Sequence, residues 1–250
     1  MDDLSAALTD LQTLTERLRR DCPWDREQDE RSIVPHTVEE AYEVADAAIA
    51  GDDAKLLDEL GDLLFQCFFL SLLLAERGRG DLAQAARLIH EKLVRRHPHV
   101  FGDVEAETPA RVRENWEKIK REQEGREGVF HDVPEGLPAL LYARKVQRRA
   151  AAVGFEYPDL DGAYADLRDE LRELEEGWSA NELGDVLFAA VNVARKLDVD
   201  PELELRAAAK RFRARVEAAE ALAARAGEDW TALPLAEQDR YFDQAKETTA

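Results

Sequence analysis

Two sets of acidic residues, spaced for one face of a helix, are the part of this 250-residue sequence best suited to chemistry. The first set reads Glu39-Glu40-x-x-Glu43, then Glu59-Leu60-Gly61-Asp62. Carboxylates three or four residues apart project from one side of a helix, so two facing helices would bring at least four of them together. Because like charges repel and resist burial without partners, a divalent cation would stabilise the arrangement. Oxygen-only ligands suit Mg²⁺ or Mn²⁺, and the pattern predicts a site for one of these ions.

A weaker copy of the acidic set follows about half a chain later. It reads Asp169-Glu170-x-x-Glu173, then Glu182-Leu183-Gly184-Asp185. Other landmarks recur in the same order: Cys22-Pro23-Trp24-Asp25 with Gly154-Phe155-Glu156-Tyr157, Lys92 and Arg96 with Arg211 and Arg215, and Trp116 and Lys120 with Phe242 and Lys246. Landmarks repeated in one order indicate a tandem duplication.

An acidic motif on a Glu-rich helix is often only a solvated face, and the residues after Asp62 argue against that here. The run from Leu63 to Ala75 is almost entirely apolar, and a helix of this kind is buried on most sides. The acids before it should therefore lie at the rim of a core. Gly61 lowers helix stability by roughly 1 kcal/mol relative to alanine, so its place among them predicts the close approach of a neighbour or ligand.

The elements that carry these residues are predicted to be helices throughout. Apolar residues recur at helical spacing from Leu4 to Leu18, good helix formers dominate, and no alternating runs suggest strands. The later predicted helices are 37–50, 53–77, 81–96, 108–123, 138–153, 161–176, 180–197, 201–225 and 235–247. A Gly- and Pro-rich stretch at 124–138 separates two halves. We therefore predict an all-α fold with domains at 1–123 and 139–250, joined by a linker at 124–138.

Composition excludes several classes of protein. The formal net charge of −20 leaves no domain-wide basic surface for a nucleic acid or an anionic membrane. The longest apolar run is too short to cross a bilayer, and no signal-peptide pattern opens the chain. Two cysteines in a chain of this length do not make a disulfide scaffold. We expect a cytoplasmic protein.

Several cationic and aromatic residues are candidate partners for a phosphorylated small molecule. Lys55 stands one turn before Glu59, and Lys92 and Arg96 stand one turn apart on a later helix. Phosphate oxygens that do not touch a metal need N–H donors of this kind. Trp116 and Lys120 are candidates for an aromatic wall and a further donor, although a Trp packed in the core is nearly as plausible.

Together these motifs resemble those of the MazG nucleoside triphosphate pyrophosphohydrolases, of the all-α NTP pyrophosphatase superfamily. The residues that carry the resemblance extend over essentially the whole chain: Cys22-Pro23-Trp24-Asp25, Glu39-Glu40-Ala41-Tyr42-Glu43, Glu59-Leu60-Gly61-Asp62, Arg95-Arg96-His97-Pro98-His99-Val100-Phe101, Asn115-Trp116-Glu117-Lys118-Ile119-Lys120 and Val153-Gly154-Phe155. The resemblance implies a tandem repeat of two MazG-like helical bundle domains, usually dimeric. It implies Mg²⁺-dependent cleavage of NTPs and dNTPs to a nucleoside monophosphate and pyrophosphate, in the upkeep of the nucleotide pool.

The resemblance also implies roles for single residues. The metal ligands would be Glu40, Glu43, Glu59 and Asp62, and in the second half Glu170, Glu173, Glu182 and Asp185. Glu39, or Asp169 in the second half, would help to position or deprotonate the attacking water. Lys55, Lys92, Arg96, Trp116 and Lys120 would contact the substrate.

The second half departs from the family pattern. Only eight residues separate Glu173 from Glu182, whereas fifteen separate Glu43 from Glu59. Trp178 stands where the first half has Lys55. Motif completeness therefore favours the N-terminal half as the catalytic one and makes nucleotide binding by the second half more doubtful.

Two other classes of protein compete with this interpretation. A ferritin-like di-iron site also lies inside a helical bundle, but it needs Glu-x-x-His pairs that this chain lacks. A non-catalytic helical interaction module with a structural metal site remains the main alternative.

Overall fold

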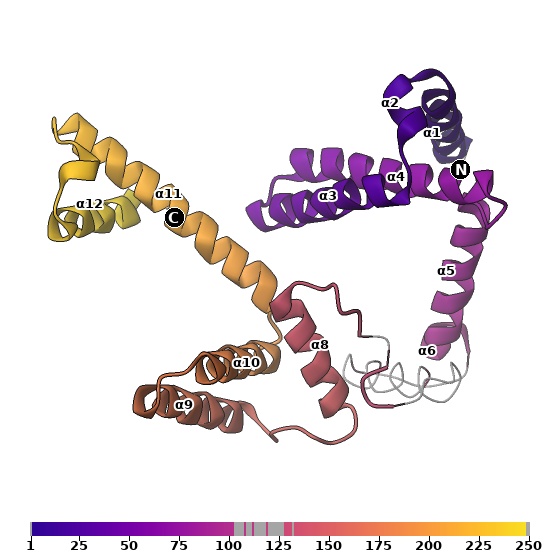
Figure 1. Cartoon of the computed structure of the whole chain (residues 1–250). Coiled ribbons are helices and arrows are strands. Elements are labelled where there is room, and N and C mark those ends of the chain that lie inside the picture. The colour runs from indigo at the N-terminus through magenta and orange to yellow at the C-terminus, as the bar shows by residue number, and fades with distance from the viewer. Residues whose placement is uncertain are drawn as a thin grey trace. The chain divides into compact units, whose positions relative to one another are not determined.

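The computed structural model describes residues 2–102, 108, 112, 119, 128–131 and 133–248. Within these residues every regular element is a helix and no strand occurs, which confirms the all-α prediction (Figure 1). Trp116 and Lys120 lie outside the described residues, as do most of the predicted helix 108–123 and part of the stretch 124–138.

The chain divides into two compact units, Met1–Glu124 and Gly125–Ala250. The helices of the first unit are α1 (Asp2–Asp21), α2 (Pro23–Glu27), α3 (Glu30–Ala50), α4 (Asp53–Glu76), α5 (Leu82–Arg96) and α6 (Pro98–Phe101). Those of the second are α8 (Ala139–Ala151), α9 (Leu160–Glu176), α10 (Ala180–Lys196), α11 (Pro201–Arg225), the 3₁₀ turn η1 (Trp230–Ala232) and α12 (Leu235–Thr248). The division falls at the start of the Gly- and Pro-rich stretch.

Each unit contains one long antiparallel helix pair that carries its acidic set. In the first unit α3 and α4 lie side by side, and in the second α9 and α10 do the same (Figure 1). The tight connection between α3 and α4 forms because Gly51 adopts the left-handed conformation, with φ of 67°, and ends α3. Asp52 then begins α4 by accepting a hydrogen bond from the backbone N–H of Lys55.

The start of α3 was predicted at residue 37, which was wrong by seven residues. The helix begins at Glu30, because Asp29 and Ser32 form a reciprocal capping box that satisfies the first backbone N–H groups. Pro35 lies inside the helix near its N-terminal end. The early start gives α3 enough length to bring Ile33 against α4.

Replacing Asp29 by alanine is expected to lower the free energy of unfolding by about 1 kcal/mol, because the cap is lost. The matched control is Asp10→Ala on the exposed face of α1, which has no capping role. Urea unfolding followed by circular dichroism measures both. A loss no larger at Asp29 than at Asp10 would contradict the role of the capping box.

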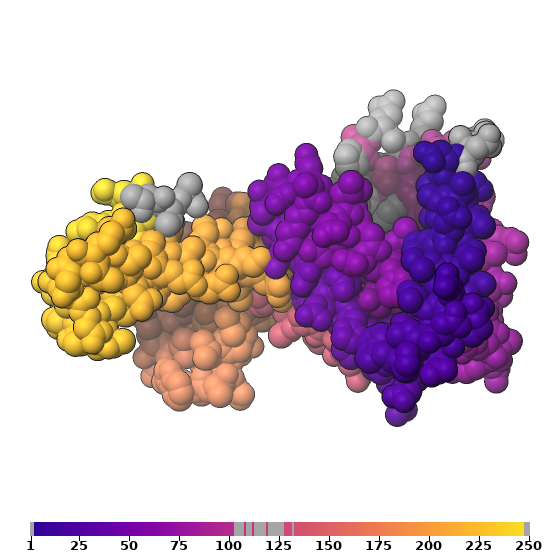
Figure 2. Space-filling model, turned by 90° about the horizontal axis from the view of Figure 1, so that it is seen from above, coloured from indigo at the N-terminus to yellow at the C-terminus, as the bar shows by residue number. Residues whose placement is uncertain are grey.

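The core of the first unit is formed by α3 and α4, with α1 lying across α4. Ile33, Phe69 and Leu73 are buried against one another, with Phe65 and Leu70 packed around them. The space-filling view shows α1, in indigo, on the surface of this unit (Figure 2). The expectation that the run 63–75 is buried on most sides holds for only part of it, since Leu64 and Leu74 remain 39% and 38% exposed.

The second unit has a separate small core at the far end of α11. Ala219 and Ala223 of α11 pack against Tyr241 and Ala245 of α12. Small residues on both helices permit this close packing. Between that core and the α9–α10 pair, α11 is exposed along much of its length (Figure 2).

No helix within the described ranges has the length and apolar character that crossing a membrane requires.

Candidate metal centres

The α3–α4 pair brings three of the predicted ligands together. Carboxylate oxygens of Glu40, Glu43 and Glu59 all lie within 4.8 Å of one another. Glu59 is only 5% exposed, while Glu40 and Glu43 are half-buried. Three carboxylates at this separation, one of them buried, fit the oxygen donor set of Mg²⁺ or Mn²⁺.

The proton affinities of two of these groups reflect the crowding. Burial raises the pKa of Glu40 above its ordinary value of 4.5, and the charges of Asp62, Glu43, Glu59 and Glu39 raise it further. Burial and a hydrogen bond with Glu43 raise the pKa of Glu59, and Lys55 partly opposes that rise. Without a cation, Glu40 and Glu59 therefore hold protons more tightly than isolated carboxyl groups do.

Lys55 takes the position next to the cluster that the sequence predicted. Its Nζ lies 3.5 Å from Oε1 of Glu59, one helical turn away, and its side chain is 52% exposed. Because Lys55 is half in solvent, its ammonium group can also reach an anionic ligand at the rim of the cluster.

Asp62 and Glu39 lie outside the group of mutually close ligand atoms. Asp62 is nevertheless near enough for its charge to raise the pKa of Glu40. Glu39 is 65% exposed, with a carboxylate oxygen 3.8 Å from Nδ1 of His36. Glu39 is thus open to solvent beside the cluster.

The second unit builds an equivalent cluster despite its shorter spacing. Oxygens of Glu170, Glu173 and Glu182 also lie within 4.8 Å of one another. Compared with the first unit, the shorter spacing removes four residues from the end of the first helix of the pair and four from the start of the second. α3 continues from Glu43 to Ala50, whereas α9 ends soon after Glu173, at Glu176. α10 likewise begins closer to Glu182 than α4 does to Glu59. Four residues are about one helical turn, so the facing sides of both helices keep their register.

The second cluster lacks a cation in the position of Lys55. Burial raises the pKa of Glu170, and the charges of Glu173, Asp185, Asp166 and Glu182 raise it further. Trp178 lies in the connection between α9 and α10 and is 80% exposed. The charge of Asp185 raises the pKa of Glu170, but its carboxylate does not belong to the group of mutually close ligand atoms. Asp62 behaves in the same way in the first unit.

Of the other predicted substrate contacts, the two that lie in the described residues, Lys92 and Arg96, are not brought to the first cluster. Lys92 and Arg96 lie on α5, which leaves the α3–α4 pair at the C-terminal end of α4 and runs away from it (Figure 1). In the second unit Arg211 and Arg215 lie likewise on α11. Phe242 and Lys246 pair with each other on α12, with Nζ 5.0 Å from the ring centroid.

The predicted close neighbour of Gly61 is absent among the described residues. A Cβ at Gly61, or at Gly184 in the second unit, would have no heavy atom of the described chain within 4 Å. Both glycines lie on exposed surface beside their clusters. The packing of the two units therefore does not explain why glycine, which destabilises a helix, stands at these two positions.

A pocket beside the second cluster was not predicted from the sequence. It has a volume of about 660 Å³ and lies between α8, α9, α10 and the loop 154–157. Its lining includes Glu170, which also belongs to the acidic cluster, together with apolar side chains such as Val146, Phe155 and Phe188. The repeat of Cys22-Pro23-Trp24-Asp25 as Gly154-Phe155-Glu156-Tyr157 was the signal that could have found it, because this loop forms one wall.

Comparisons with known proteins agree with the motifs. The model of the MazG nucleotide pyrophosphohydrolase domain matches residues 28–101, which include the whole α3–α4 pair. A nucleoside triphosphate pyrophosphohydrolase of Escherichia coli (strain K12) is 39% identical over 94% of this chain and 95% of its own length. The nucleoside triphosphate pyrophosphohydrolase/pyrophosphatase MazG of Thermotoga maritima is 37% identical over 98% of both chains.

A crystal structure of a MazG-related protein from Thermotoga maritima matches with a TM-score of 0.41 and 25% identity. It covers 46% of this chain and 99% of its own. The curated relatives match over nearly the whole chain at well above 30% identity. The chain therefore belongs to the MazG family of nucleoside triphosphate pyrophosphohydrolases, which are hydrolases that act on acid anhydrides.

Proposed function

We propose that this chain hydrolyses nucleoside triphosphates, both NTPs and dNTPs, to a nucleoside monophosphate and pyrophosphate in a Mg²⁺-dependent reaction, and so removes unwanted nucleotides from the pool. The observation that carries the proposal is the convergence of Glu40, Glu43 and Glu59 within 4.8 Å, at the positions where the family motif has its acids. Bound Mg²⁺ would offset the charge of the triphosphate and lower the pKa of a bound water.

The side chains around the first cluster have distinct roles in this proposal. Glu40, Glu43 and Glu59 would hold the metal, with Asp62 completing the set, and Mn²⁺ would be an acceptable substitute. Glu39 is solvent-exposed next to Glu40 and would accept the proton of the attacking water. Lys55 would neutralise a phosphate oxygen that no metal touches.

The second cluster would hold the same metal through Glu170, Glu173 and Glu182, with Asp185 beside them. The preference for the N-terminal half as the catalytic one depends on motif completeness and stays a prediction. The preserved register of the shortened α9–α10 pair and the adjoining pocket support a share in nucleotide binding for the second half.

We also propose a homodimer. Lys92 and Arg96 lie on α5, which runs away from the acidic cluster of its own unit (Figure 1), and a second copy could bring such cations to it. Leu57, Leu60 and Leu64 follow one another at helical spacing on α4 and are 73%, 46% and 39% exposed. An apolar stripe of this kind is suited to burial against another subunit.

A release assay tests the reaction itself. Purified protein is incubated with a panel of NTPs and dNTPs and Mg²⁺, and both products are identified by chromatography. The proposal expects equal amounts of the monophosphate and pyrophosphate. Release of inorganic phosphate and a diphosphate, or no turnover in the whole panel, would contradict it.

The raised pKa values of Glu40, Glu59 and Glu170 predict how stability depends on pH and metal. The folded state keeps protons that the unfolded state has released, so stability without metal falls as pH rises through and above 4.5. Mg²⁺ replaces these protons and should raise the melting temperature more at pH 7.5 than at pH 5. Thermal-shift scans at both pH values measure the difference, and an equal effect at the two would contradict it.

A further inference from the structure

The pocket of the second unit adjoins a site that the proposed function assigns to the triphosphate, so any ligand assigned to the pocket rests on that function. Glu170 both lines the pocket and belongs to the acidic cluster. A nucleotide whose phosphates are held at the cluster would therefore place its remaining part at the mouth of the pocket. The volume of about 660 Å³ falls within the range of small-molecule sites and is ample for a nucleobase.

The loop that walls the pocket is fixed to both neighbouring helices. The Tyr157 hydroxyl donates a hydrogen bond of 2.7 Å to Asp166 of α9. The ring of Tyr157 also packs against Gly162, where a Cβ would lie 3.2 Å from it. Glu156 forms ion pairs of 2.7 Å with Arg195 and Lys196 at the end of α10.

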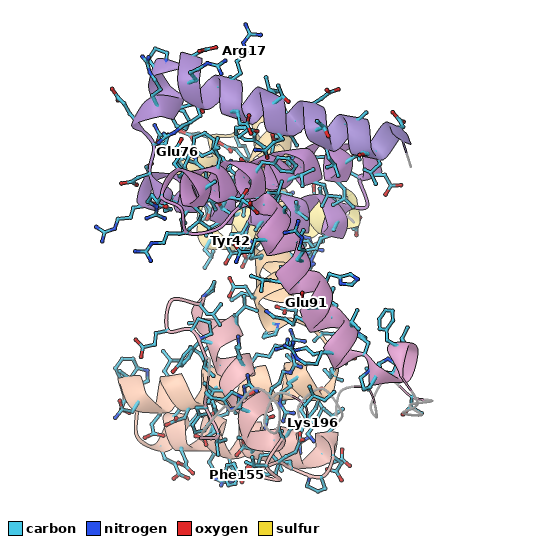
Figure 3. The ribbon with its side chains drawn as sticks, turned by 90° about the vertical axis from the view of Figure 1, so that its right-hand side faces the viewer. Arg17, Tyr42, Glu76, Glu91, Phe155 and Lys196 are labelled. Carbon is cyan, nitrogen blue, oxygen red and sulfur yellow. The ribbon has the colours of Figure 1, made fainter. Side chains whose placement is uncertain are left out.

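These contacts give the pocket its shape before any ligand arrives. Phe155, from the same loop, and Lys196 are labelled in Figure 3, which shows both in the second unit. A preformed apolar wall of this kind lowers the ordering cost of binding a flat, aromatic group.

Two polar atoms in the pocket lining have no hydrogen-bond partner among the described residues, and the acceptor of the two is Oε1 of Gln147, the other being Nε of Arg195. Gln147 is only 7% exposed, and its Nε2 donates a hydrogen bond of 2.7 Å to the backbone oxygen of Phe188. A carbonyl oxygen can only accept a hydrogen bond, so the Nε2 end of the Gln147 amide must be the end that faces Phe188. Oε1 of Gln147 is thereby left as a buried acceptor without a donor. Buried amide oxygens are nearly always paired, so this atom points to a donor supplied from outside the chain.

A second amide offers the complementary group. Asn192, which also lines the pocket, accepts a hydrogen bond of 2.6 Å from Arg195 through Oδ1. Its side-chain N–H₂ can then donate. An acceptor and a donor in one apolar pocket match the edge of a nucleobase, where an N–H donor lies beside a ring nitrogen or carbonyl acceptor.

We infer that the pocket between α8, α9 and α10 binds the nucleobase of the substrate, and that Gln147 is a specificity-determining residue whose Oε1 accepts a hydrogen bond from an N–H of the base. The apolar side chains Val146, Phe155 and Phe188 contact the faces of the base. A nucleotide that lacks the N–H leaves Oε1 unpaired, and the site rejects it for that reason.

The test compares natural nucleotides with analogues that lack the N–H donor, in Glu40→Gln, so that the turnover measured comes from the second half. The pairs are ATP with purine riboside triphosphate, CTP with pyrimidin-2-one riboside triphosphate, and UTP with 3-methyluridine triphosphate. For Glu40→Gln, kcat/KM is expected to fall about tenfold or more within at least one pair. In Glu40→Gln/Gln147→Leu the same ratio is expected to fall close to one, because the acceptor is gone.

A matched control is available in the first unit. Gln66 is 8% exposed, and its Oε1 also has no partner among the described residues, so Gln66→Leu makes the same change in a buried glutamine of the other half. Added to Glu40→Gln, it is expected to leave the ratios of Glu40→Gln unchanged. Melting curves of both variants show whether they fold.

Three outcomes would overturn the inference: no turnover of any nucleotide by Glu40→Gln, ratios near one for all three pairs in Glu40→Gln, or the same ratios retained in Glu40→Gln/Gln147→Leu. If the Gln147→Leu change prevents folding, the three pairs in Glu40→Gln alone decide. Hydrolysis of the nucleotides and of inorganic tripolyphosphate, which has no base, is measured alongside for the wild type. If the wild type cleaves neither tripolyphosphate nor any nucleotide, the proposed function has failed as well, which separates that failure from a wrong assignment of Gln147.

Discussion

Replacing both Glu40 and Glu170 by glutamine should lower the rate of pyrophosphate release from NTPs about 100-fold or more. Each substitution removes a carboxylate charge from one acidic cluster while keeping the size of the side chain. Stabilisation of the triphosphate by a metal is worth several kcal/mol, and each 1.4 kcal/mol is a factor of ten in rate. The measurement is kcat/KM for the NTP that the wild-type enzyme cleaves fastest, at saturating Mg²⁺.

The two single variants show how much of the activity depends on each half. Glu40→Gln is expected to cause the larger loss, because the first half contains the complete motif and Lys55. Glu170→Gln is expected to cause a smaller but measurable loss. A loss confined to Glu170→Gln would overturn the preference for the N-terminal half. Full activity in the double variant would contradict the assignment of both clusters.

Phe69→Ala should be the most destabilising single change in the first unit. Phe69 is 0% exposed and packs against Ile33 and Leu73, so removing the ring leaves a cavity between α3 and α4. Truncation of a buried phenylalanine costs about 3–5 kcal/mol. The matched control is Phe101→Ala, the same change at a side chain that is 63% exposed.

Urea unfolding of both variants and the wild type measures this difference. The first unit of Phe69→Ala is expected to unfold at a clearly lower urea concentration, with the midpoint of Phe101→Ala nearly unchanged. Equal midpoints for the two variants would show that the core does not lie where Phe69 packs. Because the cluster lies on the same two helices, Phe69→Ala should also weaken metal binding in proportion to the unfolded fraction.

The sequence predicted the helices well because most of them carry strong local signals. Gly51 and Asp52 mark the connection between α3 and α4, and the predicted break there is confirmed. The start of α3 was missed because its signal is a reciprocal pair of hydrogen bonds between Asp29 and Ser32, upstream of the first clear apolar period. To predict the start of α3, the capping box has to be identified before the apolar periodicity is considered.

The acidic cluster was predictable because it depends on helical spacing within two neighbouring helices. Glu40 and Glu43 share a face through local geometry alone, and the short connection makes Glu59 their neighbour. The position of Lys92 and Arg96 was not predictable in this way. It depends on the direction in which α5 leaves α4, and no local pattern sets that direction.

The pocket depends on contacts between residues far apart in sequence. Gln147 and Phe188 come from α8 and α10, and their hydrogen bond joins segments about forty residues apart. Side-chain periodicity places each residue on a face of its helix but does not say which face meets which. The shortened α9–α10 pair illustrates the same limit, since the eight-residue spacing made nucleotide binding by the second half more doubtful but did not show that both helices keep their register.

Direct measurement of metal binding tests the central claim most closely. Mn²⁺ is titrated into the metal-free protein and into Glu40→Gln, Glu170→Gln and the double variant, and free Mn²⁺ is followed by electron paramagnetic resonance. Each single variant is expected to lose one of two classes of bound Mn²⁺, and the double variant both, with Mg²⁺ displacing the ion from the wild type. Equal Mn²⁺ binding by the wild type and the double variant would contradict the claim that these carboxylates hold the metal.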